Sequence, residues 1–149
     1  MKDINGYEGL YAVDDSGNVW SYRKNDWLSQ GLQSKGYYQV VLCKNEERKT
    51  YIVHRLVAQA FLDDYSEDLQ VDHIDGNRLN NKLENLRMVT NQKNHFNRTK
   101  AKGYTWNKNA EKWQAQICIN YKKKCLGYFD TEAEAREAYL SAKKIYHII

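Results

Sequence analysis

Residues 70–97 constrain the fold of this chain most strongly, because short apolar runs alternate there with polar residues suited to a reactive site. The segment is QVDHIDGNRLNNKLENLRMVTNQKNHFN. The run from Gln70 to Ile74 predicts a short strand, and Asp75-Gly76-Asn77 predicts a turn. Thr90 is expected to cap a helix that continues to about Asn97. Apolar packing would come from Leu83, Leu86, Met88 and Val89. The predicted order is strand, turn, second strand or extended stretch, then helix.

Three polar residues of this segment suit phosphodiester hydrolysis. An imidazole titrates near neutral pH, so His73 can take a proton from water. The Asp72 carboxylate and the Asn94 amide are hard oxygen ligands, which suit Mg²⁺ or Mn²⁺ better than Zn²⁺. The ordinary alternative is that Asp72 and His73 form a polar pair on a strand and that Asn94 is an exposed helix residue.

Three sequence words around these residues carry a family resemblance: VHRLVA at 53–58, VDHIDGN at 71–77 and ENLRMVT at 84–90. Together they resemble the phage and intron homing-endonuclease branch of the HNH nucleases, in which aspartate replaces the first histidine of the motif. The resemblance implies a ββα-metal fold, with Asp72 and His73 on a strand and Asn94 on the facing helix. It also implies products with 5′-phosphate and 3′-hydroxyl ends. Asn85 matches the middle asparagine, and we assign it with His73 to the catalytic set, as a residue that supports the loop and orients His73.

The acidic residues around this segment are concentrated. Residues 61–75 contain six Asp and Glu and no Lys or Arg. Acidic side chains repel phosphate unless a cation mediates, which fits a metal site, although residues 63–68 are interpreted as a solvated acidic loop. An EF-hand loop is excluded, because with Gly76 as its sixth residue the first and twelfth would be Val71 and Lys82.

Composition narrows the class of protein. Charged residues make up 28% and hydrophobic residues 42% of the 149 residues, which indicates a globular chain. No apolar run approaches the length of a membrane span, and the N-terminus lacks the basic-then-apolar pattern of a secretory signal. Cys43, Cys118 and Cys125 are odd in number and contain no C-x-x-C pair. We expect reduced thiols in the cytoplasm of a bacterial or phage-infected cell, and no structural zinc site.

Residues 1–50 predict a small antiparallel sheet. Short β-type runs at 11–13, 19–20, 37–42 and 50–53 are separated by turn signals. The run GYEGLYAVDDSGNVWS at 6–21 resembles the modular segment often found upstream of such nucleases. A helix is predicted to follow, because apolar residues recur at i, i+3, i+4, i+7 and i+8 from Val53 to Phe61. His54 is expected to hydrogen-bond in the core in preference to a DNA or active-site role.

Residues 100–149 predict a separate basic unit. They carry 10 Lys and Arg against 5 Asp and Glu, whereas residues 1–99 carry 13 against 14. A basic balance of this kind indicates a polyanionic partner. The run 112–120 alternates apolar and polar residues as a half-buried strand does, and 103–107 and 123–129 are its expected neighbours. Thr131 and Glu134 form a capping box for a helix to about Tyr146. Its predicted apolar face comprises Ala135, Ala138, Tyr139, Ala142 and Ile145.

The words KGYTWNKNAEKWQAQI, LGYFDT and EAEAREAY in this unit resemble the ethylene-response-factor-type DNA-binding domain. In that family a three-stranded sheet enters the major groove. The positions that match its DNA-facing residues are Lys102, Thr105, Asn107, Gln116, Cys118, Lys123 and Cys125. Lys112 and Gln114 join the predicted DNA-binding set because they share the polar face. Several matching positions are arginine or tryptophan in the plant proteins, so the plant target sequence does not carry over.

Together these interpretations predict an α+β protein with a small N-terminal antiparallel sheet, a ββα-metal core and a C-terminal three-stranded sheet packed on one helix. The predicted domains are 1–50, the nuclease-associated β-rich segment; 51–99, the HNH core; and 100–149, the DNA-binding domain. We expect a DNA endonuclease of homing or mobile-element type with one Mg²⁺ or Mn²⁺ per active site. Duplex DNA is the expected partner, and no membrane association is expected. The protein is expected to be a monomer, which would nick one strand, or a homodimer, which would cut both strands. The alternatives are a non-enzymatic DNA-binding protein with a degenerate core and a nonspecific nuclease of defence or host takeover.

Overall fold

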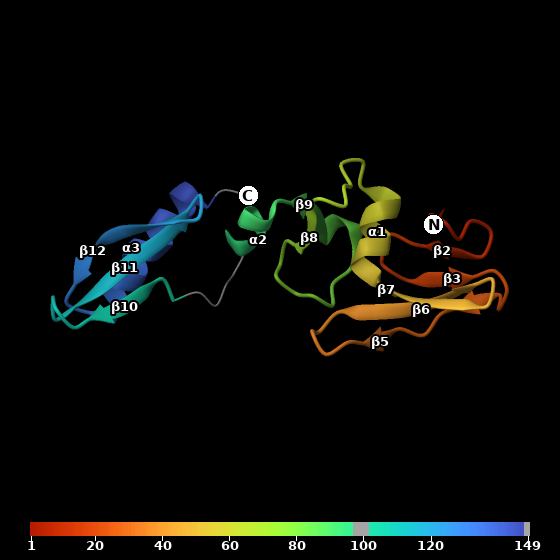
Figure 1. Ribbon diagram of the computed structural model, residues 1–149, viewed down its shortest axis with the longest axis horizontal. Helices are drawn as coiled ribbons and strands as arrows, with labels where there is room; N and C mark the ends of the chain where they lie inside the picture. Colours follow the sequence, from red (N-terminus) through yellow and green to blue (C-terminus); the bar gives the residue numbers. More distant parts are fainter. Residues whose placement is uncertain (97–101, 148–149) are drawn as a thin grey trace. The chain divides into compact units, whose positions relative to one another are not determined.

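Short antiparallel strands and the helices packed against them make up the computed structural model, which describes residues 1–96 and 102–147 (Figure 1). The α+β class predicted from the sequence is confirmed. The chain divides into two compact units, Met1–Thr90 and Asn91–Ile149, and each is described by itself. The finer division into three domains stays a prediction. Within the described residues, every helix is too short or too polar to cross a membrane.

The N-terminal half of the first unit contains two small sheets. The first has four antiparallel strands in chain order, β1 (Lys2–Asp3), β2 (Tyr11–Val13), β3 (Val19–Ser21) and β4 (Asp26–Trp27). The second has three, β5 (Gly31–Leu32), β6 (Tyr38–Lys44) and β7 (Glu47–Ile52). Asn45 and Glu46 join β6 to β7 with φ of 51° and 68°. Positive φ at both central residues is what a type I′ hairpin turn requires.

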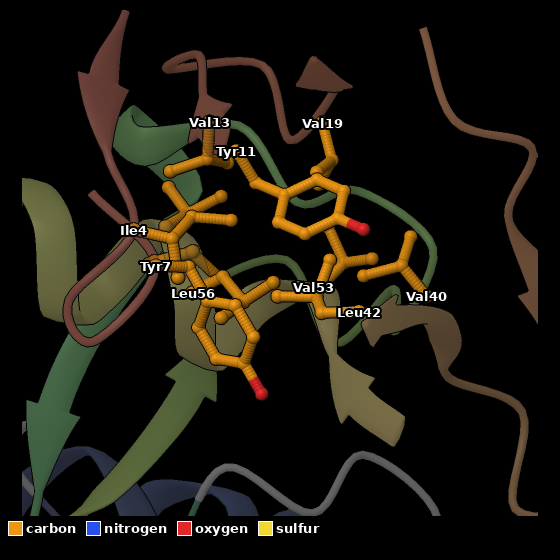
Figure 2. Close-up of a cluster of buried hydrophobic side chains, with 11 residues drawn as sticks. Ile4, Tyr7, Tyr11, Val13, Val19, Val40, Leu42, Val53 and Leu56 are labelled. Carbon is orange, nitrogen blue, oxygen red and sulfur yellow. The ribbon is translucent and has the colours of Figure 1, made fainter. Parts of the chain in front are cut away.

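Helix α1 (Val53–Phe61) joins these sheets to the rest of the unit. It begins directly after β7 and contacts β1, β2, β6, β7, β8 and β9. Its apolar stripe enters one shared core, whose buried members are Ile4, Tyr7, Tyr11, Val13, Val19, Val40, Leu42, Val53, Leu56, Val57 and Leu86 (Figure 2). Since Leu86 belongs to strand β9, the N-terminal sheets and the β8–β9 pair are stabilised by the same core.

The predicted strand–turn–strand–helix order is present in residues 70–96. Strand β8 (Gln70–His73) pairs antiparallel with β9 (Leu86–Val89), and a long loop with the short 3-10 helix η1 (Leu83–Asn85) connects them. Helix α2 (Asn91–Phe96) follows in the chain and belongs to the second unit. The predicted end of this helix at Asn97 lies outside the described residues.

The second unit contains a three-stranded antiparallel sheet and one long helix, as predicted. Strands β10 (Tyr104–Asn107), β11 (Lys112–Ile119) and β12 (Lys122–Phe129) pair in chain order, and α3 (Glu132–Tyr146) contacts all three. Thr131 caps α3, because its Oγ1 accepts a hydrogen bond from the Glu134 amide at 3.2 Å. A side chain at Gly103 (φ 77°) would collide with the Tyr139 ring, which makes glycine necessary at the start of β10.

The buried face of α3 contains fewer residues than the sequence pattern predicted. Ala135, Tyr139 and Ala142 are buried against the sheet, with Ile117 of β11 at the centre of this small core. Ile145 is 64% exposed, contrary to the prediction. Ten residues of helix rotate its side chain about 80° away from that of Ala135, which is enough to take it off the sheet.

Candidate active site

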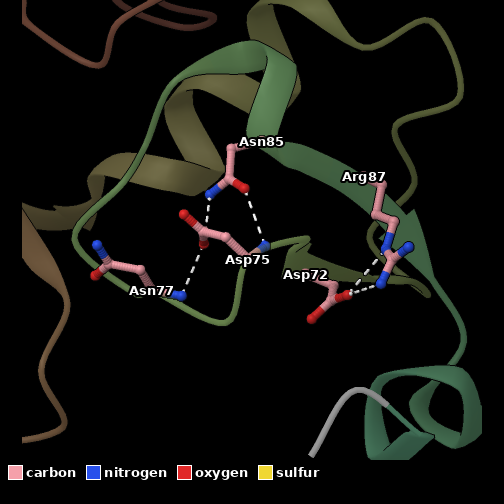
Figure 3. Close-up of polar contacts among 5 residues, drawn as sticks. All are labelled: Asp72, Asp75, Asn77, Asn85 and Arg87. Carbon is pink, nitrogen blue, oxygen red and sulfur yellow. Dashed lines mark hydrogen bonds and ion pairs between the residues drawn. The ribbon is translucent and has the colours of Figure 1, made fainter. Parts of the chain in front are cut away.

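The predicted metal ligand Asp72 is buried and paired with a cation. Asp72 on β8 is the register partner of Arg87 on β9. Arg87 donates from Nε at 2.9 Å and from Nη2 at 2.7 Å to Oδ2 of Asp72 (Figure 3). The Asp72 side chain is 7% exposed and that of Arg87 is 25% exposed. Because both donors reach the same carboxylate oxygen, the ion pair fixes the direction in which the carboxylate points.

The predicted general base His73 is bound by an amide that the sequence reasoning missed. Nε2 of His73 and Oδ1 of Asn81 are 3.0 Å apart, and both side chains are buried. An amide oxygen only accepts hydrogen bonds, so Nε2 carries a proton, and the neutral form of the ring would have its lone pair on Nδ1. In the sequence, Asn81 is one of several asparagines between β8 and β9, and its spacing does not distinguish it from the others.

Asn85, expected to support the loop and to orient His73, makes its described contacts with the loop. Its Nδ2 donates to Oδ1 of Asp75 at 2.9 Å, and its Oδ1 accepts from the Asp75 amide at 3.1 Å (Figure 3). Nδ2 also donates to the carbonyl of Asn80 at 2.9 Å. Asp75 also accepts hydrogen bonds from the Asn80 side chain and the Asn77 amide, and these lower the pKa of its carboxyl below the ordinary value. The loop thus closes on Asp75 and Asn85.

Two further rings surround the imidazole of His73. The His54 ring lies edge-on to it, with centroids 5.0 Å apart and planes at 84°, and the Tyr37 ring stacks at 6.1 Å and 30°. His54 is buried, as predicted, but its Nδ1 has no hydrogen-bond partner among the described residues. Burial above all, and then electrostatic interactions with His73 and Arg55, lower the pKa of His54 to about 3. His54 is therefore a neutral ring at ordinary pH.

The donor set available for a metal ion is rich in oxygen. In the part of the chain that the structure describes, no group of three or more His, Cys, Asp or Glu side chains gathers to hold a metal. A site at Asp72 would be completed by amide, water or phosphate oxygens, which fits Mg²⁺ or Mn²⁺. The predicted second ligand, Asn94, is a half-buried residue of α2 in the other unit, so its pairing with Asp72 stays a prediction.

Apart from Lys102, the predicted DNA-binding residues of the second unit lie on one face of its sheet. The register places Thr105 beside Gln114, Gln116 beside Cys125, and Cys118 beside Lys123. Asn107 donates to Oε1 of Gln114 at 3.2 Å, and its Oδ1 also accepts from two amides of the β10–β11 turn. Lys112 pairs with Asp130 at 3.3 Å. Lys102 precedes β10, is exposed, and accepts a bond from Arg136 on its carbonyl. Most of this face is polar and accessible.

Comparisons with known proteins identify the family. Residues 51–96 match the family model for the HNH endonuclease, and residues 2–43 match the NUMOD4 motif. A solved structure described as DNA binding and cleavage by the HNH homing endonuclease I-HmuI aligns with a TM-score of 0.64 and 35% identity, over 91% of this chain and 80% of that one. The chain belongs to the HNH endonuclease family.

Two curated phage relatives extend the comparison. DNA endonuclease I-HmuI of Bacillus phage SP01 is 46% identical over 93 residues, which cover 62% of this chain and 53% of that protein. H-N-H endonuclease F-TflII of Escherichia phage T5 is 34% identical over 97 residues, covering 64% and 50%. This chain thus spans about half the length of these two relatives.

Proposed function

We propose that this protein is a DNA endonuclease that hydrolyses phosphodiester bonds in duplex DNA, with His73 as the general base. The observation that carries the proposal is the hydrogen bond between His73 and Asn81, next to the ion pair of buried Asp72 with half-buried Arg87. It holds the imidazole with Nε2–H directed at Asn81, beside a carboxylate suited to bind a cation. A positioned base activates the attacking water, and a cation held by oxygen ligands neutralises charge on the phosphate.

In the proposed reaction, water attacks the phosphorus while Nδ1 of His73 takes a proton from that water. The bond from phosphorus to the 3′ oxygen breaks, and the leaving oxygen takes a proton from solvent. The products carry a 5′-phosphate and a 3′-hydroxyl. Asn81 stabilises the imidazolium that forms, because its amide oxygen already accepts from Nε2–H and the bond strengthens when the ring is charged.

Asp72 and Asn94 are the residues we propose to hold one Mg²⁺ or Mn²⁺. The ion, when bound, neutralises charge on the phosphate and on the leaving oxygen. Arg87 orients the carboxylate of Asp72 for this role. Asn85 and Asp75 act further away by keeping the loop closed, so that Asn81 stays in reach of His73.

The second unit is proposed to supply DNA affinity, through Lys102, Thr105, Asn107, Lys112, Gln114, Gln116 and Lys123. The chain's resemblance to the ethylene-response-factor-type domain, the basic balance of residues 100–149 and the accessible polar face of the sheet support this role. Amides such as that of Gln116 suit base edges, and lysines suit phosphates.

The test is cleavage of supercoiled plasmid by the purified protein with Mg²⁺, with Mn²⁺ and with EDTA. We expect nicked or linear product with either metal and none in EDTA. His73→Ala should lower the rate by about 10²–10⁴ and leave DNA binding unchanged, because a general base contributes little to ground-state affinity. Full activity of His73→Ala, or full activity in EDTA, would contradict the mechanism. A wild-type protein that binds DNA and never cleaves it would instead be the non-enzymatic binding protein.

A further inference from the structure

Tyr37 brings the N-terminal segment into contact with the proposed base. It directly precedes β6 and lies within residues 2–43, which match the NUMOD4 motif, whereas His54 and His73 lie within the HNH match at 51–96. The half-buried Tyr37 ring stacks on His73 at 6.1 Å and meets the edge of His54 at 4.9 Å. The ring of Tyr37, from the segment that matches NUMOD4, therefore lies against the rings of His54 and His73, from the segment that matches the HNH model.

The Tyr37 ring is itself held in place by the loop that follows β8. The guanidinium of Arg78 lies 5.1 Å from the Tyr37 ring centroid, and Arg78 donates from Nη1 to the carbonyl of Lys35 at 2.8 Å. A cation over an aromatic face and a hydrogen bond to the neighbouring backbone both fix the turn that carries the tyrosine. Arg78 thus links the loop to the segment from Lys35 to Tyr37.

A second part of the N-terminal segment contacts the partner of His73. A Cβ atom placed on Gly17 would lie 3.0 Å from Cβ of Asn81, and the φ of Gly17 is 91°. Two residues earlier, the carbonyl of Asp15 accepts a hydrogen bond from the Leu83 amide at 2.7 Å. The turn at 14–18 therefore packs closely on the chain segment that presents Asn81 to His73.

These ring contacts act on His73 together with its hydrogen bond to Asn81. A bond at Nε2 fixes one atom of the ring, but the imidazole can still rotate about the line from Cβ to Nε2. A ring stacked on its face and another against it at a steep angle oppose that rotation. The neutral, buried His54 adds this contact without a charge. Packing against the two rings thus helps to hold the plane of the imidazole and the direction of Nδ1.

We propose that Tyr37 is a positioning residue for His73, and that residues 2–43 form part of the nuclease site as well as flanking it. This inference rests on the proposed role of His73 as general base. It assigns to the N-terminal segment a task inside the active site. The shared core of unit Met1–Thr90 is consistent with the assignment, because the segment and the β8–β9 pair do not have separate interiors.

The test compares Tyr37→Leu with Tyr37→Phe in the full chain, and Tyr22→Leu is the matched control. Tyr22 lies in the same segment, is exposed, and bonds Asp3 rather than the site. Single-turnover cleavage at saturating protein gives the chemical rate, and a separate titration with EDTA present gives DNA affinity. We expect Tyr37→Leu to lower the rate by about tenfold to a hundredfold at unchanged affinity, as for a slightly misplaced catalytic group. Tyr37→Phe, which keeps the ring, should restore the rate, and Tyr22→Leu should match wild type.

A spectroscopic measurement separates this inference from the nuclease assignment. In protein labelled with ¹³C at histidine, Tyr37→Leu should shift and broaden the ring resonances of His73 and His54, since a stacked ring has been removed. Wild-type rate together with unmoved His73 resonances would overturn the inference, as would a Phe variant as slow as the Leu variant. If Tyr37→Leu does not fold, Arg78→Ala, which removes the support of the tyrosine, should give the same effects at smaller size. A wild-type protein that never cleaves DNA would overturn the proposed function. In that case, the effect of Tyr37→Leu on the ring resonances of His73 would still show whether Tyr37 orients this ring.

Discussion

Asp72 and Arg87 face each other across the β8–β9 pair, and both donors of the arginine converge on one oxygen of the carboxylate. The strand register makes this contact, because cross-strand partners hold their side chains side by side on one face. A carboxylate this deeply buried needs a cation or several donors. Arg87 supplies the cation before any metal ion binds.

Arg87→Leu should therefore destabilise the protein and change its response to metal. Removing the partner leaves the buried carboxylate without its charged donors, which costs about 1.5–3 kcal/mol of unfolding free energy. Mn²⁺ should stabilise the variant more than the wild type, since an ion that binds only the folded state stabilises it. Urea unfolding with and without Mn²⁺ measures both effects.

The matched control is Lys49→Leu. Lys49 pairs with Glu47 at 3.7 Å, but both side chains are more than half exposed. Exposed pairs contribute little, so the loss should stay below about 1 kcal/mol, with no difference in Mn²⁺. Equal losses of unfolding free energy for the two variants would show that the ion pair of Asp72 and Arg87 stabilises the fold no more than an exposed ion pair does.

Substitutions at Asn81 and at Asn85, both in this loop, should have different effects. Asn81→Ala removes the acceptor for Nε2 of His73 and should lower cleavage by about tenfold to a hundredfold, because the tautomer and ring direction are no longer fixed. Asn85→Ala removes three loop hydrogen bonds and should lower the unfolding free energy by about 2 kcal/mol. Cleavage rates and urea midpoints of both variants are the measurement. If Asn85→Ala abolished cleavage at full stability, the orienting role would belong to Asn85 after all.

The contact of Asn81 with His73 could not be predicted from the sequence. The helix from Val53 to Phe61 and the longer strands of both units follow from local patterns of apolar and polar residues, whereas the two-residue strands β1, β4 and β5 were not predicted. Which asparagine reaches His73 depends on the path of the loop between β8 and β9, and that path is set by Asp75 and Asn85 together. No local spacing encodes it.

The same reason applies to Tyr37. Its contact with His73 joins positions far apart in the chain, and the twelve tyrosines of this sequence look alike in a pattern of β-type runs. His54 lies outside the predicted apolar stripe of its helix, so periodicity alone did not predict its burial. Its contact with His73 required the tertiary structure.

The buried His54 should make stability depend on pH. Its pKa falls from an ordinary 6.5 to about 3 in the folded state, chiefly through burial. Above the unfolded value both states are neutral, and the full stability is present. As the pH falls below it, the unfolded chain takes up a proton that the folded protein refuses, so stability is lost by up to about 1.4 kcal/mol per pH unit until the folded pKa is reached.

His54→Phe keeps a ring of similar size and removes this titration. Urea unfolding of both proteins between about pH 7 and pH 5 should show the wild type losing about 2 kcal/mol more than the variant over that range. Parallel curves would mean that His54 is protonated in the folded state, and that the ring beside His73 carries a charge.

The neighbouring lysines of β12 offer a sharp test of the proposed DNA-binding face. Lys123 is exposed on the polar face beside Cys118, whereas Nζ of Lys124 lies 3.0 Å from the hydroxyl of Tyr146 and 4.7 Å from its ring centroid, on the side of α3. Lys123→Ala should weaken binding to all duplex sequences alike and reduce the salt slope of log K by about 0.9, as for one lost phosphate contact. Lys124→Ala removes the same charge and should leave the slope unchanged.

Gln116→Ala completes the test, because an amide that reads a base edge affects sequence preference and leaves the salt slope alone. We expect the variant to lose base preference at one position of the bound site, with discrimination between bases there reduced by about 1–3 kcal/mol. Binding isotherms over a range of salt concentrations, with a randomised duplex pool for preference, measure all three variants. If Lys123→Ala and Lys124→Ala reduced the salt slope equally, the effect would come from net charge and not from a specific phosphate contact. If a protein truncated at about residue 99 still bound the same sites with unchanged affinity, the sheet would be excluded as the targeting surface.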